Sequence, residues 1–124
     1  MMTTRSPERE EFLSDILITA VEGGTGYWAQ VSNYNHTPAA NAHVTLHEFE
    51  EDDNGVNPQH EVDLVTIEKG LGLYLNWLLK IYGERSMELI SKQHEVINND
   101  AGEFDAEVAD VIVQFAIFGE IKYA

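Results

Sequence analysis

Apolar side chains recur at helical spacing near the start of the chain. Between residues 7 and 22 they stand three or four positions apart, at Phe12, Leu13, Ile16, Leu17, Ala20 and Val21. Ser6 and Pro7 precede them, a pair typical of a helix N-terminus. We therefore predict a first helix over residues 7–22, closed by a left-handed C-cap at Gly23 and Gly24.

The pattern then changes to a period of two. Residues 27–34 and 43–50 alternate apolar and polar side chains, with turn-forming residues between them, and residues 60–65 are interpreted as a shorter strand. Charged residues and Gly55 make up half of residues 51–58, which favours a loop there. The sequence predicts two antiparallel strands and a short third strand.

Helical spacing returns in the second half of the chain. We expect one helix capped by Thr66 and ended by Gly83, another over residues 86–98, and an apolar one over residues 104–118. The last would begin at Glu103 or Asp105 and end at Gly119, with a final strand at residues 121–123. The predicted fold is α+β: a small antiparallel sheet of two to four strands against about four helices, in the order α-β-β-(β)-α-α-α.

Length and composition indicate one globular domain over residues 1–124. The chain is 44% hydrophobic, which is enough for a core, and it has no cysteine. The missing cysteines exclude disulfides, thiol nucleophiles and cysteine-ligated metal centres. Residues 1–11 are polar and residues 111–118 are too short to span a bilayer, so we expect no signal peptide, no membrane segment and a cytoplasmic location.

Charge narrows the range of partners. The formal net charge is -15, and no Lys or Arg stands between Arg9 and Lys69, where twelve carboxylates fall. Such a surface repels nucleic acid and anionic membranes and attracts cationic partners. We expect no direct binding of nucleic acid and a basic protein as partner. The residues expected to bind it are Glu48, Glu50, Glu51, Asp52, Asp53, Glu61 and Asp63.

Metal sites find little support in the pattern. His43 and His47 stand four apart in a segment that favours a strand, where they lie about 13 Å apart and cannot share one zinc ion. The acidic loop from Asp52 lacks the Gly and the Glu that an EF-hand requires at its sixth and twelfth positions. We expect no resident metal and no cofactor.

A second candidate site joins two distant segments. Glu22, Gly23, Gly24, Tyr27 and Trp28 combine backbone freedom with two aromatic rings, as a ligand pocket does. Asp110 and Gln114 form a polar pair on an apolar helix. The alternative is structural: a helix end, a core tryptophan and a satisfied hydrogen bond.

Both ends of the chain resemble one protein family. Residues 15–24, followed by Tyr27, Trp28 and Ala29, and residues 99–106, followed by Ala109, Asp110, Val113, Gln114, Phe118 and Gly119, are similar to small acidic hypothetical proteins of actinobacteria, their plasmids and their phages. The resemblance implies a setting of mobile elements, where small acidic proteins often inhibit host factors. It implies no activity and no catalytic residues.

Two functions follow as hypotheses. The first is a non-enzymatic binding or inhibitor protein that acts through its acidic face on a basic partner, of which nucleic-acid-binding proteins are one class. The second is a small-ligand-binding protein or enzyme that uses the pocket residues named above. Adaptation to high salt would also explain the charge, and the sequence leaves the oligomeric state open.

Overall fold

The computed structural model describes residues 5–102 and 104–124. Four α-helices and three strands follow one another as α1 (Pro7–Thr19), β1 (Ala29–Asn35), β2 (His43–Glu48), β3 (Gln59–Asp63), α2 (Leu64–Tyr82), α3 (Met87–Ile97) and α4 (Ala106–Phe118). Short helical turns η1 (Ala20–Gly24), η2 (Thr25–Tyr27) and η3 (Ala39–Asn41) join the first elements. This order confirms the predicted α+β class.

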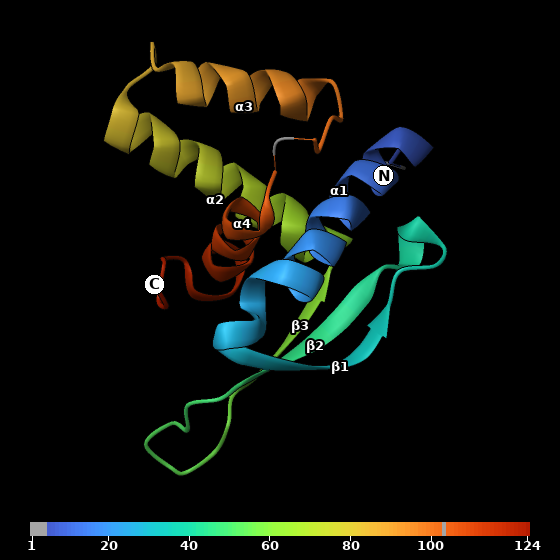
Figure 1. Cartoon of the computed structure of the whole chain (residues 1–124), viewed down its shortest axis with the longest axis vertical. Coiled ribbons are helices and arrows are strands. Elements are labelled where there is room, and N and C mark those ends of the chain that lie inside the picture. Colours follow the sequence, from blue (N-terminus) through green and yellow to red (C-terminus); the bar gives the residue numbers. More distant parts are fainter. Residues whose placement is uncertain (1–4, 103) are drawn as a thin grey trace, which may run out of the picture.

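The sheet is a single antiparallel layer with β2 in the centre. Its strand order is β1-β2-β3, and Leu46 of β2 lies opposite Val31 of β1 and His60 of β3. The helices lie on one side of the sheet, and the loop between β2 and β3 extends away from the body of the molecule (Figure 1). Val44, Leu46 and Val62 are buried against the helices, whereas Gln30, Ser32 and Glu61 point the other way and are exposed.

Helices α2 and α4 cross at the centre of the core. Gly70 of α2 makes this crossing possible, because a Cβ atom there would lie 2.2 Å from the Ile112 carbonyl oxygen. Large apolar side chains of α1 complete the same core, among them Phe12, Leu13 and Ile16.

The first helix ends differently from the prediction. Its α-helical part stops at Thr19, and residues 20–24 continue as a π-turn. Gly24 has a φ of -111°, so the expected left-handed cap at these glycines is wrong. A Cβ atom on Gly24 would lie 2.6 Å from the Ala106 carbonyl oxygen, so glycine is required for close packing against α4.

Other helix ends follow the sequence more closely. Asp63, not Thr66, caps α2: its carboxylate accepts the Thr66 N–H, and the Thr66 hydroxyl accepts the Asp63 N–H. The predicted stop at Gly83 and the predicted start at Asp105 are confirmed. The helix expected over residues 86–98 is α3, with Ser86 as its N-cap. Gly119 is left-handed after α4, as expected. The alternative start at Glu103 lies outside the described residues.

The predicted last strand is wrong. Residues 121–123 form no strand, and the sheet consists of β1, β2 and β3 within the described residues. Instead, the N–H groups of Lys122 and Tyr123 both donate to Oε1 of Gln114, at 2.9 and 2.8 Å. A side chain of α4 therefore holds the end of the chain in place of a neighbouring strand.

Candidate functional site

Exposed carboxylates gather on the loop between β2 and β3. Glu50, Glu51, Asp52 and Asp53 are consecutive and all exposed. The loop lies within the stretch that contains no Lys or Arg, so no Lys or Arg of the three strands offsets this charge. We call residues 49–58 the acidic loop.

Internal hydrogen bonds give the acidic loop a defined shape. Oδ1 of Asp52 accepts the N–H groups of Asn54 and Val56, at 2.8 and 3.0 Å, and Gly55 takes a φ of +75°. The Asn57 side chain donates to the Glu48 and Phe49 carbonyls, at 3.1 and 3.0 Å. Asp52 therefore builds the turn, while Glu50, Glu51 and Asp53 present their charges to solvent.

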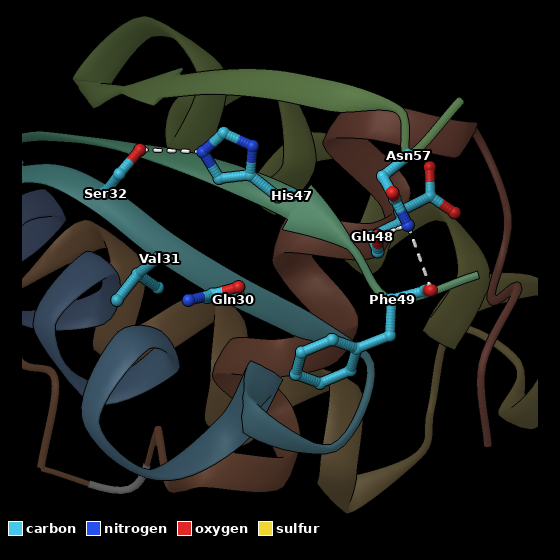
Figure 2. A pocket seen from close by; sticks show the side chains of 7 residues that line it. All are labelled: Gln30, Val31, Ser32, His47, Glu48, Phe49 and Asn57. Atoms are coloured by element: carbon cyan, nitrogen blue, oxygen red, sulfur yellow. Dashed lines mark hydrogen bonds between the residues drawn. The ribbon is translucent and has the colours of Figure 1, made fainter. Parts of the chain in front are cut away.

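A hollow with a mainly polar lining lies at the base of the acidic loop. It has a volume of about 350 Å³ and is lined by Gln30, Val31, Ser32, His47, Glu48, Phe49 and Asn57. The Phe49 ring points outward and is 53% exposed, and the Ser32 hydroxyl is hydrogen-bonded to His47 at 2.7 Å (Figure 2). Val56 on the same loop is also exposed. The strongest negative charge of the chain thus stands beside exposed apolar surface.

Two other predicted partner-binding residues stay on the surface. Glu61 of β3 is exposed on the uncovered face of the sheet, and its carboxylate accepts the Thr45 hydroxyl at 2.9 Å. Asp63 is exposed but is committed to capping α2. Of these two, Glu61 extends the negative surface beyond the acidic loop along the sheet.

Glu48 departs from the prediction because it is only 2% exposed. Its alternation with Val44 and Leu46 turns it toward the helices, where it accepts from His60 Nε2 at 2.7 Å, Lys122 Nζ at 2.8 Å and the Tyr123 hydroxyl. Burial alone would raise the pKa of this carboxyl, but these three donors outweigh it and the pKa is lowered. Glu48 therefore fastens the C-terminal segment to the sheet and is not part of the acidic face.

The structure brings together four of the predicted pocket residues. Asp110 Oδ2 accepts the Tyr27 hydroxyl at 2.7 Å, and Oδ1 accepts Trp28 Nε1 at 2.8 Å and Gln114 Nε2 at 3.1 Å. Trp28 is 2% exposed and stacks on Tyr123, with ring centroids 5.2 Å apart. The tryptophan is thus a core residue, and the Asp110–Gln114 pair satisfies buried hydrogen bonds.

Glu22 does not join this cluster. It is exposed on η1, where its carboxylate accepts the Tyr34 hydroxyl at 2.9 Å. Burial is the first cause of the raised pKa of Tyr34, about 12, and the hydrogen bond to Glu22 adds to it. Glu22 connects η1 to β1.

A groove of about 730 Å³ opens beside the cluster. Its lining comes from η1, η2, α2, α4 and the C-terminal segment: Gly23, Gly24, Tyr27, Trp77, Ala106, Glu107, Asp110, Val111, Ile121, Tyr123 and Ala124. We call it the aromatic groove. Trp77 and Ile121 were not anticipated from the sequence, because only the tertiary packing brings α2 and the C-terminal segment to α4.

The histidines do not converge on a common centre. His43 and His47 lie on β2, as the strand prediction requires, and His60 is bound to Glu48. Among residues 5–102 and 104–124, no three His, Asp or Glu side chains are grouped to hold a metal ion. In the same part of the chain, no helix combines the length and the apolar character needed to cross a bilayer.

No family model, curated protein or solved structure matches the chain. The arrangement of its own residues is therefore the basis for a functional proposal.

Proposed function

We propose that the chain is a non-enzymatic binding protein whose acidic loop docks on a basic partner protein. The observation that carries the proposal is the pairing of exposed carboxylates with exposed Phe49 and Val56 on one loop of defined shape. Protein interfaces commonly combine an apolar centre with a polar rim. Phe49 and Val56 would supply the apolar centre, and Glu50, Glu51 and Asp53 the polar rim.

Charge complementarity identifies the kind of partner. A partner with a basic surface should bind the acidic loop fastest and most specifically, because opposite charges accelerate encounter and favour the correct orientation. Proteins that bind nucleic acid carry such surfaces. A row of carboxylates can compete with phosphates for the same arginines and lysines, which suits an inhibitor and agrees with the resemblance to small acidic proteins of mobile elements.

A charge-matched comparison tests the proposal. The loop variant E50Q/E51Q/D53N removes three charges but keeps Asp52, which holds the turn. The control E11Q/E84Q/E120Q removes three charges at exposed positions on α1, before α3 and after α4. Binding of a labelled peptide rich in Arg and Lys, with one aromatic residue, is measured by fluorescence anisotropy at two salt concentrations.

We expect the loop variant to weaken binding about tenfold at low salt and the control by less than about threefold. For the unmodified chain, affinity should fall steeply as salt rises. Equal losses in the two variants would show that binding follows net charge alone, and affinity that is insensitive to salt would contradict the proposal.

A further inference from the structure

The aromatic groove combines ring surfaces with negative charge. The Tyr27 and Trp77 side chains line it together with Val111 and Ile121, and Asp110 and Glu107 supply two carboxylates. The lining contains no Lys, Arg or His. Aromatic faces beside carboxylates attract organic cations, since both the ring quadrupole and the full charge favour a positive group.

Asp110 is the buried charge of this groove. It is only 5% exposed, and its donors, the Tyr27 hydroxyl, the Trp28 indole and the Gln114 amide, are all neutral. The ion pairs of the described residues join other carboxylates, Glu48, Glu68 and Glu95. Asp110 thus lies in a low-dielectric site and takes part in none of the ion pairs among residues 5–102 and 104–124, so a bound positive charge would interact strongly with it.

The cluster around Asp110 also has more acceptor positions than donor hydrogens. Tyr27 and Trp28 offer one hydrogen each and the Gln114 amide nitrogen two. They face the Asp110 carboxylate, which accepts about four bonds, and the Tyr123 carbonyl, which accepts about two. The Tyr123 carbonyl lies 3.1 Å from Gln114 Nε2 and 3.2 Å from the Tyr27 hydroxyl. A ligand that brings further N–H donors would complete this arrangement.

We propose that the aromatic groove binds a small organic cation, an ammonium group on an apolar or aromatic body. The ammonium group lies toward Asp110, Glu107 and the Tyr123 carbonyl, and the apolar body lies against Tyr27, Trp77 and Val111. This site uses α4 and the C-terminal segment, so it is separate from the acidic loop and adds a ligand to the proposed protein partner.

Three small probes of similar shape test the charge preference. Phenethylammonium carries the positive group, 2-phenylethanol is the neutral counterpart, and phenylacetate is the anionic one. Binding is followed by intrinsic fluorescence, since Trp77 lines the groove, and by calorimetry. We expect saturable binding of phenethylammonium at least about tenfold tighter than that of the alcohol, and no binding of phenylacetate.

Variants locate the probe. Val111→Lys places an ammonium group within the groove and should abolish binding, whereas Val65→Lys makes the same charge change at an exposed position of α2 and should alter affinity less than about threefold. Asp110→Asn should weaken binding at least about tenfold. Glu107→Gln, at an exposed position that leaves the core intact, should weaken it about threefold.

The proposal is overturned if phenethylammonium shows no saturable binding, if the alcohol binds equally well, or if V111K and V65K behave alike. The loop variant E50Q/E51Q/D53N should bind the probe as the unmodified chain does. Failure of this site therefore remains distinguishable from failure of the acidic loop as a docking surface.

Discussion

Replacing Gly70 by Ala is expected to destabilise the protein, although Ala is the better helix former. Gly70 lies within α2, where Ala in place of Gly gains about 1 kcal/mol of helix propensity. The new Cβ atom, however, would lie 2.2 Å from the Ile112 carbonyl oxygen and 2.9 Å from the Ala116 Cβ atom of α4. Helix backbone cannot rotate away as a side chain can, so the two helices must separate.

The size of the effect follows from this geometry. A 2.2 Å approach is more than about 1 Å short of van der Waals contact, and overpacking of a core costs about 1–3 kcal/mol. If overpacking costs about 3 kcal/mol and helix propensity returns about 1 kcal/mol, Gly70→Ala should lower the free energy of unfolding by about 2 kcal/mol. Gly72→Ala is the matched control, because its Cβ atom would meet nothing within 4 Å, and it should gain about 1 kcal/mol.

Urea unfolding followed by circular dichroism measures both variants. With a slope of about 2 kcal/mol per molar urea, the midpoint should fall by about 1 M for G70A and rise by about 0.5 M for G72A. Separation of α2 from α4 should also move Trp77 relative to Val111 and weaken binding of phenethylammonium. A G70A protein as stable as G72A would refute the argument from close packing.

Three further predictions concern the buried polar groups. Glu48→Gln should cost about 1–3 kcal/mol at pH 7. Folding lowers the pKa of Glu48, so the ionised carboxylate stabilises the folded protein above the unfolded pKa of 4.5. This stabilisation is lost as pH falls through the lower folded pKa. The difference in unfolding free energy between the unmodified chain and E48Q should therefore be smaller at pH 3 than at pH 7. Trp28→Phe removes the donor to Asp110 and should lower the free energy of unfolding by about 1–3 kcal/mol, measured with urea. Trp28→Ala also removes the buried ring and should lower it by about 3–5 kcal/mol. A stably folded W28A protein that has lost only ligand binding would contradict a core role for Trp28. Gln114→Leu removes the acceptor of the Lys122 and Tyr123 N–H groups, so hydrogen exchange of these two amides should accelerate, and unchanged rates would show that Gln114 does not hold them.

Local signals in the sequence were sufficient for most of the fold. Periodicity located the four helices and three strands, and short polar side chains and glycines marked ends such as Ser86, Asp105 and Gly119. Such caps act within four residues, so a single sequence reveals them. The end of α1 was predicted wrongly because Gly24 packs closely against α4, which is more than eighty residues away in the sequence.

The candidate site was harder to predict, for the same reason. The period of two along β2 places Glu48 on the same face as Val44 and Leu46, so its burial was visible in the pattern. Its partners Lys122 and Tyr123 were not, since they come from the other end of the chain. Asp110 and Gln114 stood out as polar positions on an apolar helix, but Trp77 was indistinguishable from any other core residue of α2.

The proposed function requires that the acidic loop, and not the net charge, recognises a basic partner. Backbone amide NMR during titration with the Arg- and Lys-rich peptide tests it most directly. We expect shifts to gather on residues 49–57, on Gln30, Val31 and Ser32 around the hollow, and on Glu61. Shifts spread evenly over α1, α3 and the other negative surfaces, or confined to the aromatic groove, would contradict it.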